Sequence, residues 1–340
     1  MKSRFIVVGS MLLAAIAVIL YQEYVNKDEL ISIQGVTMGV ITYNIKYVGK
    51  TDYPRKPQID SVLQAFNQSL STYVSNSEIS TLNTTGVLNN PSVMFEDVMT
   101  TSLTVWEKTG GIFDPTIGPI VNKWGFGPNK QINKVDTAEI QQLLNNVGFS
   151  KITRTNGQYS MDKDMYLDFS AIAKGYAVDL VAQYLENHAV FNYMVEIGGE
   201  VRTKGNNVRN DHWRIGIENP LVERAEQKLF AIVEMSTLSM ATSGNYRNYY
   251  EKDGRLIAHT IDPRNGFNTN HNLLSATVFA KNCIEADAFA TACMVMGVEE
   301  SIKLAQKVGL DLFLIYNDED GNLATFATSG IKKRITEVKN

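Results

Sequence analysis

The segment IEADAFATACMVMG, residues 284–297, constrains the fold most, because it is almost wholly apolar and yet contains Asp287 and Thr291. Two residues four apart lie on one face of a helix, about 40° of rotation apart. One interpretation is local: Asp287 caps the start of a buried helix and Thr291 bonds back to a backbone carbonyl. The other is a site for a hard cation such as Mg²⁺, which favours a carboxylate together with neutral oxygen ligands.

Strand and helix patterns along the rest of the chain favour an α+β fold. Residues 31–49 alternate like strands, and Ile59, Val62, Leu63, Phe66 and Leu70 recur at helical spacing. Further helices are expected at 93–109, 137–147, 170–187 and 301–308. Strands or hairpins are expected at 159–165, 193–205, 213–220, 229–244, 273–283, 311–318 and 325–330. Loops are expected at 83–91 and in the Gly/Pro-rich stretch 111–130, where so long a loop indicates function.

Charge and residue usage exclude several classes of protein. The 340 residues carry a net charge of −4 with interleaved signs, which argues against a nucleic-acid-binding protein. Four histidines without ligand spacing argue against a zinc site. The two cysteines, Cys283 and Cys293, are too few for a disulfide scaffold. A single bridge between them stays open, although Cys293 is expected to be a small buried apolar residue.

The first 27 residues resemble a targeting segment. Lys2 and Arg4 precede 17 residues without a charge, FIVVGSMLLAAIAVILY. This length is at the lower limit for a membrane-spanning helix, so an uncleaved anchor, a cleaved signal and an ordinary buried helix all stay open. In the first two cases positive charge keeps the N-terminus in the cytoplasm. We therefore expect an inner-membrane location, with residues 28–340 facing the extracytoplasmic space.

Three further segments carry side chains suited to a phosphate or metal site. In LDFSAIAKGYAVDL, Asp168 precedes a helix start and Ala171 offers a backbone carbonyl. Lys174 either adds a positive charge to the site or is an ordinary solvated lysine of the helix. The upstream glycines of a phosphate-binding loop are missing. SMATSGNYRNYY supplies small hydroxyls and a glycine where backbone can approach a phosphate. AHTIDPRNG places His259 near the turn residue Asp262, where the histidine can be catalytic or a satisfied loop residue.

Nine segments in order resemble one family across nearly the whole chain after residue 30. They are VTMGVITYNIKY, LSTYVSNSEISTLN, GGIFDPTIGPIVNKWGFG, LDFSAIAKGYAVD, EIGGEVRTKG, WRIGIENP, ATSGNYRNYY, HTIDPRNG and EADAFATACMVMG. Together they resemble the ApbE family of FAD:protein FMN transferases. The resemblance implies a two-lobed, T-fold-related α+β fold with mixed or antiparallel sheets flanked by helices. It also implies Mg²⁺-dependent transfer of FMN from FAD to a threonine of Nqr- or Rnf-type flavoprotein subunits, with release of AMP.

The resemblance also implies roles for individual residues. Those contacting FAD would be Met38 and Tyr73 at the flavin end, the loop Phe113, Asp114 and Pro115 beside it, and Asp168, Lys174 and Ile261. The metal ligands would be the Ala171 carbonyl, Asp287 and Thr291. His259 would be the base, with Asp287 as the competing candidate.

This chain departs from the family pattern at several points. It has Val40 where many relatives have threonine, FSAIAKG in place of a glycine pair, and Glu200 where aspartate is common. It also lacks the lipoprotein cysteine. Two alternative functions stay open on the sequence: an Mg²⁺-dependent pyrophosphatase that hydrolyses FAD to FMN and AMP, and an FAD-binding carrier without chemistry.

Overall fold

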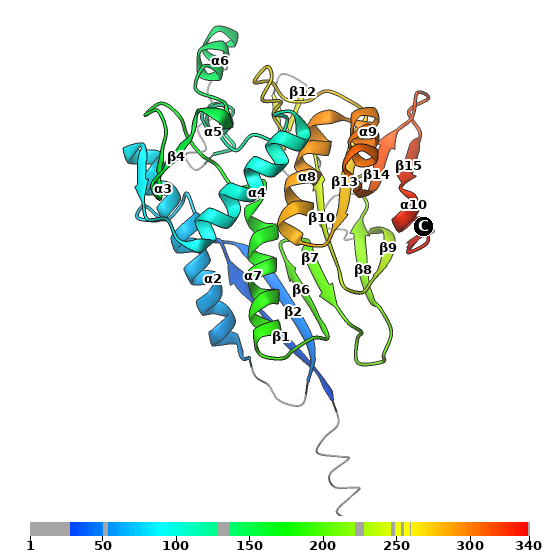
Figure 1. The fold of residues 1–340 in the computed structure, drawn as a ribbon. Coiled ribbons are helices and arrows are strands. Elements are labelled where there is room, and N and C mark those ends of the chain that lie inside the picture. The colour runs from blue at the N-terminus through cyan, green and yellow to red at the C-terminus, as the bar shows by residue number, and fades with distance from the viewer. Residues whose placement is uncertain are drawn as a thin grey trace, which may run out of the picture.

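An eight-stranded antiparallel sheet forms the centre of the protein (Figure 1). The computed structural model describes residues 28–49, 54–127, 136–221, 228–245, 249–252, 255–258 and 260–338. The strand order is β1–β2–β6–β7–β10–β13–β14–β15. The bounds are β1 Glu29–Thr37, β2 Ile41–Gly49, β6 Tyr193–Ile197, β7 Glu200–Lys204, β10 Leu238–Gly244, β13 Leu273–Ala280, β14 Asp311–Asn317 and β15 Leu323–Ala327.

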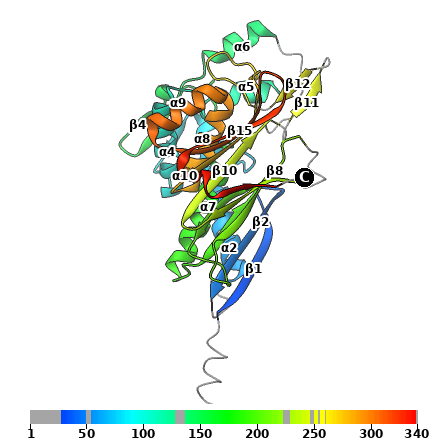
Figure 2. The ribbon, with the colours of Figure 1, turned by 90° about the vertical axis from the view of Figure 1, so that its right-hand side faces the viewer.

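Helices cover one face of this sheet, as Figures 1 and 2 show from two directions. They are α2 (Lys56–Leu70), α4 (Val93–Thr109), α7 (Ala173–Asn187), α8 (Cys283–Met296) and α9 (Val298–Val308). The largest apolar core lies between these helices and the sheet, and it includes fully buried Tyr43, Phe66 and Phe289. Helix α8 is apolar on nearly every side because it packs on β10 and β13 and against α4 and α7.

A smaller sheet covers the opposite face of the central one. Its order is β16–β9–β8, with bounds Ile335–Glu337, Leu229–Met235 and Trp213–Glu218. Trp213, Ile215 and Val233 from this sheet pack against Met240 and Phe313 of the central sheet, which forms a second apolar core. The α+β fold expected from the sequence is therefore confirmed, and every strand pairing in the described sheets is antiparallel.

The remaining elements are short helices and two further small sheets. They are α3 (Glu78–Thr85), α5 (Gly118–Lys123), α6 (Thr137–Leu144), a 3₁₀ turn (Phe149–Lys151), and α10 (Ser329–Lys332) near the C-terminus. A third sheet contains β3 (Val87–Asn89), β5 (Gln158–Ser160) and β4 (Thr153–Thr155). Strands β11 (Tyr249–Lys252) and β12 (Arg255–Ala258) form a separate hairpin.

Local signals explain which expected elements are correct. Helix α4 has the expected bounds because the Ser92 side chain accepts a hydrogen bond from the Phe95 N–H and Gly110 ends the helix with φ 64°. The stretch 111–130 is not wholly irregular, because α5 lies in it with a proline in its first turn. The loop expected at 83–91 instead contains the end of α3 and strand β3, and the hairpin expected at 159–165 lies at 153–160.

Both cysteines are free and buried, so the disulfide that the sequence left open does not form. The N-terminal segment 1–27 lies outside the described residues. Among the helices that the structure describes, none combines the length and hydropathy of a membrane span.

Candidate active site

The contact between α7 and α8 forms the centre of the candidate site. The Asp287 carboxylate is 5% exposed, and its Oδ2 accepts a hydrogen bond of 2.9 Å from the Gly175 N–H. A Cβ at Gly175 would lie 2.7 Å from the Cys283 carbonyl carbon and 2.8 Å from the Asp287 Cβ. Only glycine therefore allows α7 to approach α8 closely enough to bond the Asp287 carboxylate.

Asp179, not Asp287, accepts the hydrogen bonds from the first N–H groups of α8. The Asp179 carboxylate accepts hydrogen bonds from the N–H groups of Cys283 (3.0 Å) and Ile284 (2.9 Å), and it also pairs with Arg202 at 2.7 Å. Burial raises the pKa of Asp179, whereas Arg202 and the two N–H donors lower it. The capping interpretation of Asp287 is therefore wrong, because α8 begins at Cys283 and its first N–H groups bond to a residue of α7.

Lys174 lies between two carboxylates. Its Nζ is 2.6 Å from Glu200 Oε1 and 3.6 Å from Asp287 Oδ1, and its side chain is 29% exposed. Glu200 is the first residue of β7 and is only 1% exposed. Lys174 is therefore no solvated surface lysine: its ammonium compensates two carboxylates at the edge of the buried region.

Ala171 lies in the turn that precedes α7. The Ala173 N–H at the start of α7 bonds to the Phe169 carbonyl at 2.8 Å, and the Tyr176 N–H bonds to the Ile172 carbonyl at 3.2 Å, so neither of these bonds uses the Ala171 carbonyl. The Gly175 N–H is directed to Asp287 instead of back along the chain. Thr291 lies one turn beyond Asp287 on the same face of α8 and is half-buried.

The β1–β2 turn approaches this cluster through the turn between β6 and β7. The Gly198 N–H donates to the Thr42 carbonyl at 3.0 Å, and a Cβ at Gly198 would lie 2.8 Å from Ile41 and 3.3 Å from the Lys174 Cδ. Met38, in the same β1–β2 turn, has φ 48°, which is uncommon for a non-glycine residue. Gly39 beside it also has a positive φ, of 82°, so both residues adopt the left-handed conformation in the short turn that joins Thr37 to Ile41.

The loop 113–115 lies against the segment that carries Asp168. The Asp168 N–H donates to the Pro115 carbonyl at 2.8 Å, and Ile117 forms a parallel bridge with Tyr166. The Asp168 carboxylate accepts a hydrogen bond from the Ser170 N–H at 2.8 Å, while burial raises the pKa of Asp168. The structure thus brings together two segments that are more than fifty residues apart in the sequence.

Asp114 holds this loop together through four internal hydrogen bonds. Its carboxylate accepts from the Thr116 N–H and hydroxyl, from the Trp106 ring N–H and from the Phe149 N–H, at 2.6–3.1 Å. Burial raises the pKa of Asp114, and these donors lower it. Phe113 is also buried, with 3% of its surface exposed. In this structure, therefore, Asp114 and Phe113 fix the shape of the loop.

Tyr73 is exposed, at 72%, and lies near a tyrosine that the sequence did not single out. Burial raises the pKa of Tyr166, the Asp168 charge and Tyr73 raise it further, and interactions with Thr72 and Asn83 lower it. Tyr73 and Asp168 therefore both act electrostatically on the Tyr166 hydroxyl.

Of the remaining two expected residues, Ile261 lies in a separate small core and His259 is not described. Ile261 is 6% exposed and packs with Ile120, Trp124 and Ile140 in a third small core. His259 lies outside the described residues. Among the residues that the structure covers, no group of three or more His, Cys, Asp or Glu side chains is arranged to hold a metal.

Comparison with known proteins identifies the family. The model of the ApbE family matches residues 38–314. The chain belongs to the ApbE family. It is 38% identical to the FAD:protein FMN transferase of Haemophilus influenzae, over 92% of this chain and 94% of the relative, and 39% identical to that of Vibrio cholerae, over 89% and 92%.

Solved ApbE structures have the same fold. The flavin transferase ApbE from Vibrio cholerae superposes with a TM-score of 0.80 at 36% identity, over 90% of this chain and 99% of the other. The apo flavinyl transferase ApbE of Pseudomonas stutzeri gives a TM-score of 0.80 at 33% identity, over 90% and 97%.

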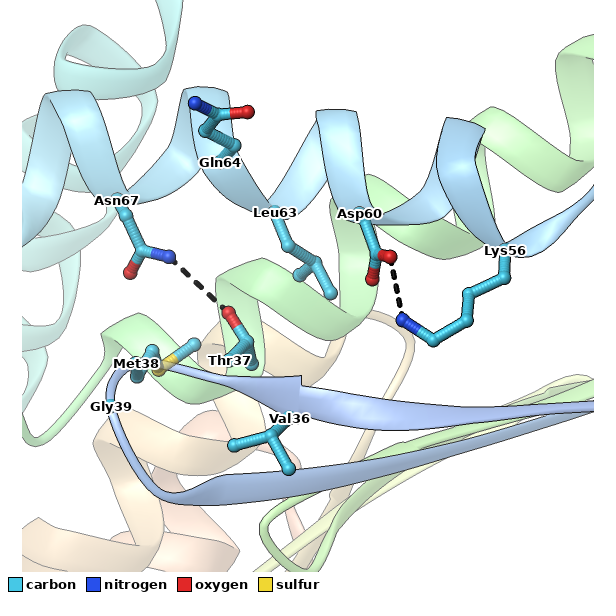
Figure 3. Close-up of a pocket in the computed structure, with 9 residues that line it drawn as sticks. All are labelled: Val36, Thr37, Met38, Gly39, Lys56, Asp60, Leu63, Gln64 and Asn67. Atoms are coloured by element: carbon cyan, nitrogen blue, oxygen red, sulfur yellow. Dashed lines mark hydrogen bonds and ion pairs between the residues drawn. The ribbon is translucent and has the colours of Figure 1, made fainter.

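A recess of about 330 Å³ lies beside the β1–β2 turn of this ApbE chain, between β1 and α2 (Figure 3). Figure 3 shows Lys56 and Asp60 at one end of the recess and Met38 and Asn67 at the other. Lys56 and Asp60 form an ion pair of 2.6 Å, so their charges neutralise one another. Met38 thus forms part of the wall of the recess as well as part of the turn near Lys174.

Sequence reasoning missed several residues that build the site. The Asn83 side chain, in α3, forms two hydrogen bonds with the Leu167 backbone: it donates to the carbonyl at 2.9 Å and accepts from the N–H at 2.7 Å. Gly175, Asp179 and Tyr166 were also missed, and Glu200 was noted only as a departure from the family. A glycine inside an expected helix was the one available signal, since such a glycine often marks close packing.

Proposed function

We propose that this ApbE-family protein is an FAD:protein FMN transferase that moves FMN from FAD to a threonine hydroxyl of an acceptor protein and releases AMP. One observation carries the proposal: Lys174 and Asp287 meet at the contact of α7 and α8, in a chain that resembles named transferases over about nine-tenths of its length. The names of those relatives favour neither FAD hydrolysis nor binding without turnover.

FAD would bind across the segments that the structure brings together. Its flavin end would contact Met38 and the exposed Tyr73, beside the 113–115 loop, with Ile261 further along the site. Asp168 would also contact FAD. The pyrophosphate carries about two negative charges, and a site poor in water must compensate them. Lys174 would supply one positive charge, held in place by its ion pairs.

A Mg²⁺ ion would be held by Asp287, the Thr291 hydroxyl and the Ala171 carbonyl. The donor set fits: one carboxylate and two neutral oxygens, with phosphate oxygens completing it, is the set that Mg²⁺ prefers in nucleotide sites. The Ala171 carbonyl lies in the turn before α7, and the Asp287 carboxylate is fixed by the Gly175 N–H. When bound, the ion would draw negative charge from the phosphorus that is attacked.

The transfer itself forms one bond and breaks one. The threonine oxygen bonds to the FMN phosphorus, the bond from that phosphorus to the AMP oxygen breaks, and the hydroxyl proton passes to a base. His259 is our candidate for the base because imidazole titrates near neutral pH, with Asp287 as the competitor. Asp287 already accepts a hydrogen bond from Gly175 and lies beside Lys174, which favours its role as a ligand.

We further propose that the acceptors are Nqr- or Rnf-type flavoprotein subunits and that the catalytic unit, residues 28–340, is periplasmic. The location is supported by the uncharged run that follows Lys2 and Arg4, which is typical of an anchor or an export signal. The acceptors are those that the resemblance to the ApbE family implies. A fusion of residues 1–27 to a periplasmic reporter enzyme should therefore give an active, membrane-associated reporter. Reporter activity confined to the cytoplasm would contradict this location.

Transfer is tested by mixing the purified full chain with FAD, Mg²⁺ and a threonine-bearing acceptor. We expect a protein band whose flavin fluorescence survives denaturation. Asp287→Ala should lower transfer by more than about a hundredfold, because loss of a ligand exceeds the 10–100-fold cost of losing an outer-shell partner. Thr291→Ala should weaken it less.

A matched control is Asp97→Ala, which removes an exposed carboxylate that bonds the Tyr176 hydroxyl of the same α7 helix. It should leave transfer near the wild-type rate. An Asp287→Ala protein that transfers FMN at the wild-type rate would contradict the assignment of the site.

A further inference from the structure

Glu200 holds Lys174 more closely than Asp287 does. The Lys174 Nζ is 2.6 Å from Glu200 Oε1 but 3.6 Å from Asp287 Oδ1. Glu200 is 1% exposed, whereas the Lys174 side chain is 29% exposed. The buried carboxylate is thus the closer partner, and Asp287 stands at the longer distance from the ammonium.

The position of Glu200 is fixed by the turn before it. Ile197 and Glu200 are paired across a tight turn, in which Gly198 has φ 63° and Gly199 has φ 102°. The Glu196 carboxylate accepts a hydrogen bond of 2.8 Å from the Gly199 N–H and closes the turn. The backbone that carries Glu200 is therefore held in place by the turn.

The Lys174 stem lies across the same turn. A Cβ at Gly198 would be 3.3 Å from the Lys174 Cδ, which is tighter than most contacts between side chains. Glycine at this position leaves room for the lysine to run past the turn to Glu200. The turn glycine and the carboxylate after it thus direct one lysine away from α8.

We propose that Glu200 is a positioning residue that keeps Lys174 from neutralising Asp287, so that the Asp287 carboxylate is available to a divalent cation. The inference rests on the proposed function, because that function places the cation on Asp287. An ammonium and a metal ion compete for the same carboxylate. With Glu200 present, Lys174 is shared between two carboxylates and reaches Asp287 only at the longer distance of 3.6 Å. Without Glu200, Lys174 and Asp287 would cancel.

The test measures divalent-cation binding without FAD, using Mn²⁺ as the probe and the electron paramagnetic resonance signal of free Mn²⁺ as the readout. Glu200→Gln should weaken Mn²⁺ binding by about tenfold, the size expected for coupled charges in contact. Lys174→Gln should bind Mn²⁺ at least as tightly as the wild type. The double variant should return to within about threefold of the wild type, since the competing ammonium is gone.

Glu186→Gln is the matched control. Glu186 also joins α7 to β7 through an ion pair with a lysine, Lys204, at 2.9 Å, and the structure places Arg202, Tyr193 and Lys204 around it, not Asp287. It should leave Mn²⁺ binding unchanged. Thermal melting of each variant checks folding, and Glu200→Asp, with a shorter side chain, should give a smaller loss than Glu200→Gln.

Three results would overturn the inference. Glu200→Gln that binds Mn²⁺ as tightly as the wild type would show that Glu200 does not protect Asp287, while wild-type FMN transfer would leave the proposed function standing. Equal weakening in Glu200→Gln and in the double variant would show that Glu200 acts by its own charge and not through Lys174. Absence of Mn²⁺ binding by the wild type would remove both this inference and the metal site, independently of the transfer assay.

Discussion

Replacing Gly175 by alanine tests whether the close approach of α7 and α8 creates the site. The new Cβ would lie 2.7 Å from the Cys283 carbonyl carbon and 2.8 Å from the Asp287 Cβ, and closer still to the Cys283 oxygen. Carbon atoms pack at about 3.5–4.0 Å, so the two helices must separate by about 1 Å. Because the obstacle is backbone, no side chain can turn away to relieve it.

The free-energy change can be worked from these contacts. Overpacking costs about 1–3 kcal/mol, and weakening the hydrogen bond from the Gly175 N–H to the charged Asp287 costs about 1.5–3 kcal/mol. Alanine regains about 1 kcal/mol of helix propensity, which leaves a net loss of about 1.5–5 kcal/mol. A displacement of about 1 Å at Asp287 should also lower FMN transfer by about a hundredfold.

Urea unfolding and the in-gel flavin assay measure the two effects separately. Gly216→Ala is the matched control, since its Cβ would meet only the end of the flexible Leu229 side chain, and it should cost less than about 1 kcal/mol. If Gly175→Ala unfolds at the wild-type urea concentration and transfers FMN at the wild-type rate, the argument from helix approach is refuted.

Three further outcomes are expected. Asp179→Asn should lower the free energy of unfolding in urea by about 2–4 kcal/mol. Losing one partner of a buried pair costs about 3–5 kcal/mol, but Glu186 still pairs with Arg202. An unchanged free energy of unfolding would contradict the role of Asp179 at the start of α8. Burial raises the pKa of Cys293 to about 11 and also raises that of Cys283, so a thiol reagent at pH 8 should label neither residue in the native protein and both in denaturant. Burial alone would raise the pKa of Glu186, but Tyr193, Lys204 and Arg202 hold this pKa below the ordinary value of a glutamate. This depressed pKa stabilises the fold above the unfolded-state pKa and is lost on acidification, so the stability difference between wild type and Glu186→Gln should be largest near pH 7 and should shrink below about pH 4.

Local signals made much of the fold predictable. The α4 helix is marked at both ends, by Ser92 and by Gly110, and the hairpin of β1 and β2 is marked by alternation of β-branched residues. Helix α5 was missed because glycine and proline dominate the surrounding stretch, although proline in a first helical turn costs little. Such signals act over a few residues, so they reveal elements and not their partners.

The candidate site was predictable only in part, for the same reason. The helical spacing of Asp287 and Thr291 correctly placed both residues on one helix and one face. The partners of Asp287 were not predictable, because the bond from Gly175 spans 112 positions and nothing local marks it. Glu200 could be noted only as a substitution, since its contact with Lys174 depends on how β7 packs beside α7.

Three hydrogen bonds, made at two positions of α7, join this helix to α8 and limit how the protein can respond to a substrate. Gly175 bonds to Asp287, and one turn later Asp179 bonds to the N–H groups of Cys283 and Ile284. Two attachment points fix both the spacing and the rotation of the antiparallel pair, so neither helix can slide without breaking the other point. Within the part of the chain that the structure describes, adjustment to an incoming molecule is therefore expected at the periphery, in the turn around Met38 and in the exposed Tyr73 ring, while the contact of α7 and α8 stays rigid.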